Sequence, residues 1–158
     1  MKKILLITLF LLGTYVTQAQ SKSNELDIVY YYKDVNNTAI KDVIAKSLNE
    51  GKVPILYFYA DWCAPCKKFS KAMKNKELKS AMKNATFIKI NVDNDVADNG
   101  QAITSKYGIR LIPTFIKVDK DANVIARITS DKWDKDVPKE IAPVINDLIN
   151  SDTYNSDK

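Results

Sequence analysis

The sequence predicts an α/β fold in which helices cover both faces of a central mixed sheet. Three patterns support this: a continuously apolar strand at 53–60, a helical pattern directly after it, and two strands joined by a short turn at 114–129. A strand–helix–strand order implies parallel pairing, whereas a hairpin adds antiparallel strands. A chain of 158 residues that is 46% hydrophobic can bury one such core.

The first 19 residues have the pattern of an export signal. Lys2 and Lys3 precede an apolar stretch at 4–12, and small residues precede a cleavage site after Ala19. The apolar stretch is shorter than the ~20 residues that a membrane span needs, which disfavours a retained anchor. We therefore expect cleavage near Ala19 and a periplasmic or otherwise exported mature protein.

The rest of the chain divides into three parts. Residues 20–37 form a polar N-terminal extension that contains a possible strand at 28–32, and residues 151–158 form a flexible tail. Between them, residues 38–150 carry the regular patterns of a single domain.

The domain starts with a helix and a buried strand. Apolar residues at helical spacing over 40–48 follow the helix-cap candidates Asn37 and Thr38, and Gly51 ends the pattern. The strand 53–60 is apolar at successive positions rather than alternating, which predicts burial on both faces.

The later elements follow the same order of strands and helices. One long helix is expected from Cys63 to Met82, then a strand at 87–92 and a loose helix at 96–107 that Gly108 ends. Strands at 114–118 and 124–129 flank a turn at 120–123, and a helix at 134–150 closes the domain.

The only two cysteines, Cys63 and Cys66, lie three residues apart where the buried strand passes into the long helix. The N-terminus of a helix favours an anion, and such positions lower a cysteine pKa from ~8.5 into the range ~3.5 to 7.5. Cys63 is therefore expected to be the attacking thiolate. Cys66 lies one turn further on the same helical face and is expected to resolve the mixed disulfide.

The composition excludes several other kinds of chemistry. There is no histidine, which rules out a Cys–His protease and a Cys/His zinc finger. Two cysteines supply only half of a tetrahedral site, so neither a metal nor another cofactor is expected. The net charge of +5 does not imply a nucleic-acid partner.

Two motifs carry a family resemblance. The residues Trp-Cys-Ala-Pro-Cys-Lys at 62–67, with Tyr-Gly-Ile-Arg-Leu-Ile-Pro-Thr at 107–114, resemble the thioredoxin superfamily over residues 40–149. The run Phe-Tyr-Ala-Asp-Trp-Cys at 58–63 is most similar to thioredoxin domains of exported bacterial proteins, such as the C-terminal domain of DsbD. This resemblance implies the thioredoxin fold.

The resemblance also implies a docking surface beside the dithiol. In thioredoxin-like proteins the bond that matches Ile112–Pro113 is cis, and the backbone of the preceding residue pairs with an extended substrate, a form of strand addition. The expected substrate-binding residues are Trp62, Ala64, Pro65, Ile112 and Pro113.

Three residues are expected to tune the redox chemistry. Tyr57 occupies the position where thioredoxins carry a buried aspartate that helps to move the proton of the second cysteine, and Lys89 matches the lysine that pairs with that aspartate. A phenol that titrates near ~10 cannot take this proton at neutral pH, so the resolving step is expected to be slow. Lys67 next to Cys66 favours a thiolate.

Taken together, these features predict an exported thiol–disulfide oxidoreductase that exchanges disulfides with protein partners. We expect a monomer that acts as a reductant or electron relay and is recharged by a membrane electron donor of the DsbD type. One alternative is a net disulfide oxidase or isomerase. Another is a non-catalytic binding or chaperone module whose two cysteines remain an idle disulfide.

Overall fold

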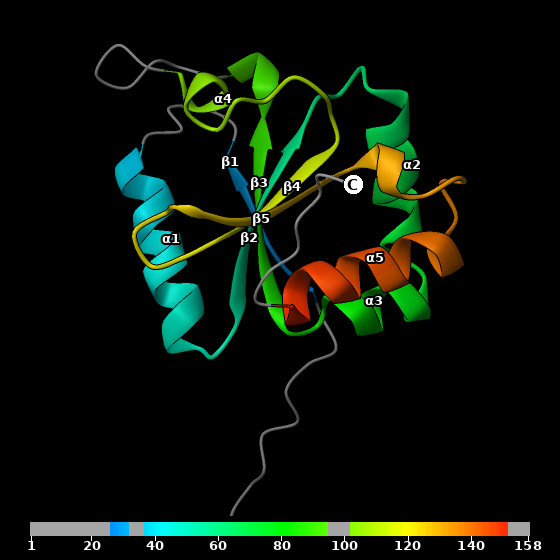
Figure 1. Ribbon diagram of the computed structural model, residues 1–158, viewed down its shortest axis with the longest axis horizontal. Coiled ribbons are helices and arrows are strands. Elements are labelled where there is room, and N and C mark those ends of the chain that lie inside the picture. Colours follow the sequence, from blue (N-terminus) through cyan, green and yellow to red (C-terminus); the bar gives the residue numbers. More distant parts are fainter. Residues whose placement is uncertain (1–25, 32–36, 95–101, 152–158) are drawn as a thin grey trace, which may run out of the picture.

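The computed structural model describes residues 26–31, 37–94 and 102–151. Helices lie on both faces of a five-stranded mixed sheet, which confirms the predicted fold class (Figure 1). The expected export signal at 1–19 lies outside the described residues, and so does the predicted tail at 151–158 apart from Ser151. In the part of the chain that is described, no helix is long and apolar enough to cross a membrane.

The sheet has the strand order β1-β3-β2-β4-β5. Strands β1, β3 and β2 run parallel, while β4 and β5 pair antiparallel with the strand before them in the sheet. Their bounds are β1 Asp27–Tyr31, β2 Val53–Tyr59, β3 Ala85–Asn91, β4 Thr114–Val118 and β5 Val124–Thr129. The carboxyl ends of β2 and β3 therefore meet the amino end of β4 at one end of the sheet.

Strand β1 belongs to this sheet although it lies within residues 20–37, which the sequence pattern assigns to an N-terminal extension. It pairs with β3 over its whole length, from Asp27 opposite Thr86 to Tyr31 opposite Ile90. Lys52, at the start of β2, donates to the Asp27 carboxylate at 2.6 Å, and the Thr86 hydroxyl donates to the same oxygen. These contacts join β1 to both parallel strands.

The helices divide between the two faces of the sheet. On one face lie α1 (Asn37–Asn49) and the short α4 (Ile103–Lys106), and on the other lie α2 (Ala64–Ala72), α3 (Lys76–Met82) and α5 (Pro138–Asn150) (Figure 1). Short 3₁₀ turns occupy Val92–Asn94 and Ser130–Lys132.

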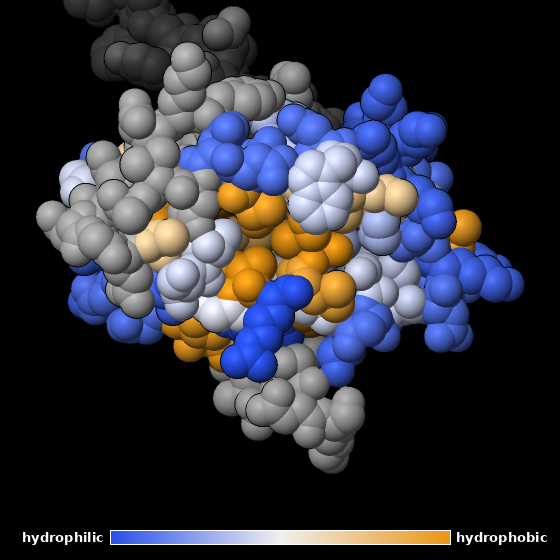
Figure 2. Space-filling view, turned by 90° about the horizontal axis from the view of Figure 1, so that it is seen from above, coloured by the Kyte–Doolittle hydropathy of each residue, from blue (hydrophilic) through white to orange (hydrophobic). Residues whose placement is uncertain are grey.

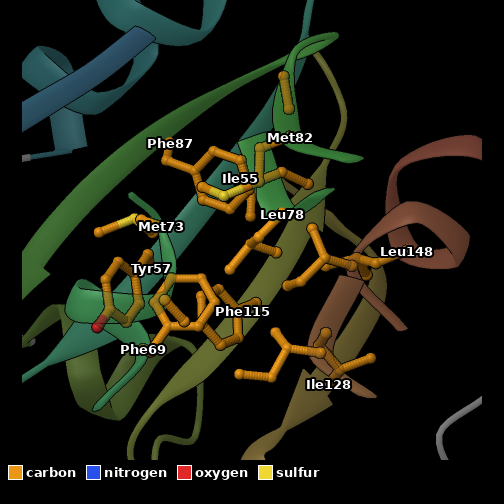
Figure 3. Packing of buried hydrophobic residues seen from close by; sticks show 14 of the residues in the cluster. Ile55, Tyr57, Phe69, Met73, Leu78, Met82, Phe87, Phe115, Ile128 and Leu148 are labelled. Atoms are coloured by element: carbon orange, nitrogen blue, oxygen red, sulfur yellow. The ribbon is translucent and has the colours of Figure 1, made fainter. Parts of the chain in front are cut away.

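Strand β2 contributes to the core on both faces, as its continuous apolar pattern predicts. Leu56 and Phe58 pack with α1 and α4, whereas Ile55, Tyr57 and Tyr59 pack with α2, α3 and α5. Successive side chains on a strand point to opposite faces, so a strand buried on both sides needs apolar residues throughout. Figure 3 shows the second of these clusters, with Tyr57 beside Phe69 and Phe115.

The prediction of one long helix from Cys63 to Met82 is wrong, because two helices occupy this stretch. Helix α2 ends at Ala72, and Asn75 adopts an extended backbone conformation and accepts a hydrogen bond from the Glu77 N–H at 2.8 Å. This is the geometry of an N-cap, which starts a new helix instead of continuing the old one. The break lets α3 pack against α5.

Two other predicted helices are shorter than expected. Only α4, Ile103–Lys106, is present from the helix predicted at 96–107, of which residues 96–101 lie outside the described part. The last helix begins at Pro138 rather than at residue 134, because proline suits the first helical position, where its missing N–H is not needed. Trp133, in the loop before it, packs into the core against Phe115.

A buried lysine fastens the end of α5 to the sheet. Lys117 on β4 is 8% exposed, and its Nζ donates to the carbonyl oxygens of Ile149 at 3.0 Å and Ser151 at 2.7 Å. The last carbonyl groups of a helix lack partners within the helix, so this ammonium group satisfies two acceptors that the chain cannot satisfy locally.

Candidate active site

The two cysteines lie at the end of the sheet where β2 passes into α2. Cys63 is the N-cap of α2, and its sulfur accepts the backbone N–H of Cys66 at 3.2 Å. The two residues form a disulfide, and their Cα atoms are 5.2 Å apart. Pro65 lies in the first turn of α2, where its fixed backbone angle favours the helix that presents both sulfurs.

Both cysteines are buried in this oxidised form, Cys63 with 4% and Cys66 with 2% of its surface exposed. Both belong to the cluster that also contains Phe69 and Tyr59. Ala64, between them, is exposed, and Pro65 is half-buried. The disulfide is therefore almost fully covered, although the first turn of α2 beside it is exposed.

The loop that precedes β4 lies against the first cysteine. The Cys63 sulfur is 3.7 Å from the carbonyl oxygen of Ile112. The Ile112–Pro113 peptide bond is cis, which confirms the expectation from the sequence. Ile112 contacts the core clusters on both faces of the sheet, so this loop is anchored from two sides.

An arginine on the edge strand holds the start of the same loop. The Arg127 guanidinium on β5 donates to the carbonyl oxygens of Tyr107 and Gly108. Gly108 has a backbone φ of +58°, a conformation that side chains with a Cβ rarely adopt. The turn out of α4 is therefore fixed by glycine geometry and by a charged donor.

An apolar rim surrounds the dithiol. Figure 2 shows this end of the molecule with a patch of apolar side chains near its centre, crossed by one strongly hydrophilic side chain. Trp62 is 67% exposed and Leu111 is 48% exposed. The Trp62 Nε1–H donates to the Asp93 carboxylate at 3.0 Å, so this exposed ring has a fixed orientation.

Tyr57 lies in the core and not at the surface. Its ring stacks on Phe115, with centroids 4.7 Å apart, and meets Phe69 edge-on at 5.3 Å (Figure 3). The buried hydroxyl makes no hydrogen bond with any residue that the structure describes. Burial raises the pKa of Tyr57 far above its ordinary value, and the nearby Ser70 hydroxyl offsets this only in part.

Lys89 lies among three tyrosine rings. The parallel register places Tyr30 of β1 and Tyr57 of β2 on either side of Lys89 of β3. The Lys89 Nζ is 3.9 Å from the ring centre of Tyr59, 4.9 Å from Tyr30 and 5.8 Å from Tyr57, all within the range of a cation–π contact. Burial lowers the pKa of Lys89, and the Asp61 carboxylate acts in the opposite direction.

A hollow of about 390 Å³ opens beside Cys66. It is lined by Tyr59, Ala60, Asp61, Cys66, Lys67, Ser70, Lys71 and Lys89. Asp61 lies at the turn between β2 and α2, and its Oδ2 accepts a hydrogen bond from the Asn91 amide at 3.3 Å. The hollow therefore joins the second cysteine to the charged groups at the ends of β2 and β3.

The structure brings most of the predicted site residues together. The dithiol, the first turn of α2 and the loop before β4 meet at one end of the sheet, while Lys67 and Lys89 line the hollow behind Cys66. Tyr57 belongs to the core beneath them.

The site residues expected from the sequence do not include Asn91, Asp93 or Asp61. The signal for Asn91 was a polar residue at the end of an apolar strand. Among the residues described, no group of three or more His, Cys, Asp or Glu side chains could hold a metal ion.

The sequence model of the family named Thioredoxin matches residues 31–142 of this chain. Thioredoxin F2 of Arabidopsis thaliana is 34% identical over 83 residues, which is 52% of this chain and 41% of that protein. The thiol-disulfide oxidoreductase ResA of Bacillus thuringiensis is 27% identical over 121 residues, 63% of this chain and 70% of that protein. The match to thioredoxin F2 thus spans less than half of that relative.

Two solved structures are similar to this chain, and the first of them shows the same fold. A disulfide isomerase from Xylella fastidiosa superposes with a TM-score of 0.56 at 21% identity, over 77% of this chain and 96% of that one. The C-terminal domain of DsbD from Neisseria meningitidis, in its oxidised form, is 27% identical over 62% of this chain and 84% of that domain, with a TM-score of 0.47.

Proposed function

Because this chain belongs to the thioredoxin family, we propose that it is a thiol–disulfide oxidoreductase that acts through Cys63 and Cys66. One observation carries the proposal: the only two cysteines form a disulfide at the N-terminus of α2, directly against the loop of Ile112 and Pro113. A structural disulfide could lie anywhere in the fold. A disulfide at a helix N-terminus beside an apolar rim is placed for exchange with another protein.

In the proposed reaction, the Cys63 thiolate attacks one sulfur of a substrate disulfide. A bond forms between Cys63 and that sulfur, and the other substrate sulfur leaves as a thiolate. Cys66 then attacks the Cys63 sulfur, which restores the disulfide of this protein and releases the second substrate thiol. The substrate gains two electrons, and the dithiol loses two.

Cys63 has the better position for the first attack. As the N-cap of α2, its sulfur accepts the Cys66 N–H, and a thiolate there gains from this donor and from the helix dipole. Cys66 is 2% exposed and lies inside α2 among its buried residues. The exposed side chains of Trp62 and Leu111 support an apolar docking surface. The backbone of Ile112 is proposed to pair with an extended substrate there.

Features of the sequence support the proposed direction and place of the reaction. Residues 1–19 support export, and Ala64-Pro65 between the cysteines resembles the reducing type of the family, whose potential in thioredoxin lies near about −270 mV. The proposed role is that of a reductant or electron relay for protein disulfides outside the cytoplasm. A membrane donor of the DsbD type would supply its electrons, and the protein would act as a monomer.

Reduction of insulin by the mature protein, with a chemical reductant present, tests the activity. Cys63→Ser is expected to abolish the reaction, whereas the native protein accelerates it. Equal rates for the two proteins would favour the non-catalytic binding module. Equilibration with glutathione then tests the direction, because a potential near that of a strong oxidant would contradict a reducing role.

A further inference from the structure

The resolving step of the proposed reaction needs an acceptor for one proton. Cys66 is 2% exposed, and burial among apolar residues disfavours a free thiolate. The Tyr57 hydroxyl is already protonated at neutral pH, because burial raises its pKa above the ordinary value of a phenol. It therefore cannot accept the proton of Cys66. The acceptor must therefore lie on another side of Cys66.

The hollow beside Cys66 contains one suitable group. Its volume of about 390 Å³ is large enough for several water molecules, each of which occupies about 30 Å³ in the liquid. The lysines that line it are protonated donors, and the Ser70 and Tyr59 hydroxyls are weak bases. Asp61 carries the only carboxylate among the lining residues.

A buried amide holds Asp61 in place. Asn91 is 4% exposed, and its Oδ1 accepts the Asp93 N–H at 2.9 Å. This contact fixes which end of the amide is the oxygen, so Nδ2 is left to donate to the Asp61 Oδ2 at 3.3 Å. The carboxylate is thus oriented at the hollow by a side chain that cannot turn without losing a bond to the backbone.

Charged groups from three elements face Asp61. Lys89 on β3 is attracted by the carboxylate without a direct ion pair, and Lys67 and Lys71 of α2 line the same hollow. Asp93 lies beyond Asn91 in the 3₁₀ turn after β3. The positive charges of these three lysines favour a thiolate at Cys66. None of the three ammonium groups has a lone pair that could accept the proton.

We propose that Asp61 accepts the proton of Cys66, through water in this hollow, as Cys66 attacks the mixed disulfide. The proposal rests on the proposed function and assigns one step within it. The Cys66 S–H bond breaks, and its proton passes through water to the Asp61 carboxylate. The electron pair left on the sulfur forms the Cys66–Cys63 bond, and the substrate sulfur departs as a thiolate.

If Asp61 acted only through its negative charge, replacing it would change the rate of the resolving step in the opposite direction. A negative charge near a thiol disfavours its thiolate, so removing that charge would make Cys66 ionise more readily. If Asp61 acted only as a charge, Asp61→Asn would speed the resolving step. If Asp61 accepts the proton, the same substitution slows it.

Stopped-flow reaction of the reduced protein with a symmetric aromatic disulfide, whose halves become coloured thiolates on release, separates the two steps. Attack by Cys63 releases the first half in a phase that depends on reagent concentration. Resolution by Cys66 releases the second half in a first-order phase that does not. Asp61→Asn and Asp61→Glu are compared with Asp42→Asn, which makes the same change at an exposed site on α1.

At pH 7 we expect Asp61→Asn to slow the second phase by about tenfold or more and to leave the first phase present. The rate deficit of Asp61→Asn should shrink as the pH rises, because hydroxide can then ionise Cys66 directly. Asp61→Glu should recover much of the rate, and Asp42→Asn should match the native protein.

An unchanged or faster second phase in Asp61→Asn would refute the proposal, and so would a deficit that stays constant with pH, which would indicate altered packing. The absence of any first phase in the native protein would instead refute the proposed function itself. The two failures are therefore distinguishable in one experiment.

Discussion

Replacing Tyr57 by phenylalanine should stabilise the protein by about 1 kcal/mol. The Tyr57 ring is 1% exposed, and its hydroxyl makes no hydrogen bond with a described residue. A buried polar group without a partner costs about 1–3 kcal/mol relative to its hydrated state in the unfolded chain. Phenylalanine keeps the stacking on Phe115 and the edge contact with Phe69, so that cost disappears while the aromatic packing remains.

The void that the substitution leaves is small. One oxygen atom occupies on the order of 10 Å³, and at about 24 cal/mol per Å³ this void costs about 0.2 kcal/mol. The desolvation cost that is removed is at least about 1 kcal/mol. Subtracting the cost of the void leaves a net increase in the free energy of unfolding of close to about 1 kcal/mol. In a domain of this size, such a gain raises the melting temperature by about 4 °C.

Tyr107→Phe is the matched control. Tyr107 is also a buried tyrosine, 3% exposed, but its hydroxyl donates to the carbonyl oxygen of Ala122 at 3.0 Å. Its loss should destabilise the protein by about 1–2 kcal/mol, because the acceptor is left without its partner.

Unfolding of the oxidised proteins in guanidinium measures the free energy of unfolding of both variants. When the dependence on denaturant concentration has the same slope in both, a shift of the midpoint reports a change in stability. If Tyr57→Phe lost as much stability as Tyr107→Phe, the Tyr57 hydroxyl would have a partner such as Ser70, and the reasoning would be refuted. The second phase of the aromatic-disulfide reaction should be unchanged in Tyr57→Phe.

Three further outcomes are expected. Cys66→Ser should accumulate mixed disulfides with exported proteins, detected on non-reducing gels, and recovery of such adducts from Cys63→Ser alone would reverse the two roles. Lys117→Met should lower the free energy of unfolding by about 2 kcal/mol and speed amide exchange at the end of α5, because two carbonyl groups lose a charged donor; unchanged exchange there would contradict this cap. Asp27 has a lowered pKa in the folded protein, chiefly because Lys52 donates a hydrogen bond to it. Its ionised form therefore stabilises the fold at a pH above the pKa of Asp27 in the unfolded chain, and this stabilisation is lost as the pH falls through the pKa in the folded protein. Asp27→Asn should therefore reduce the acid dependence of stability below about pH 4. The effect should be less than about 1 kcal/mol because the pair is only partly buried, and an unaltered slope in acid titrations would contradict this.

The parts of the site that depend on short stretches of chain could be predicted from the sequence. The Cys63–Cys66 pair and its helix are encoded within a few residues, and the loop of Pro113 is encoded by a second short motif. The helix break at Asn75 was missed because apolar residues continue at helical spacing across it. Asn75 itself, a common N-cap residue, was the available signal for a new helix. The helical spacing of the apolar residues around it favoured one continuous helix instead.

The surroundings of Lys89 depend on three strands and could not be predicted from the sequence. Its position between Tyr30 and Tyr57 requires the strand order and the register of both parallel pairs. The contact between Asn91 and Asp61 likewise joins the end of one strand to the turn after another. The order of residues along the chain identifies each of them as polar or aromatic, but it does not show which of them contact one another.

The alternation of β2 has a practical consequence for protein engineering. Ile55, Tyr57 and Tyr59 face the layer that carries the dithiol, whereas Leu56 and Phe58 face α1 and α4. A combinatorial library restricted to Leu56 and Phe58 can change thermal stability, because those side chains do not share a packing layer with the sulfurs. A library at the odd-numbered positions screens instead for altered reduction potential, so that two traits that usually vary together can be selected in separate rounds.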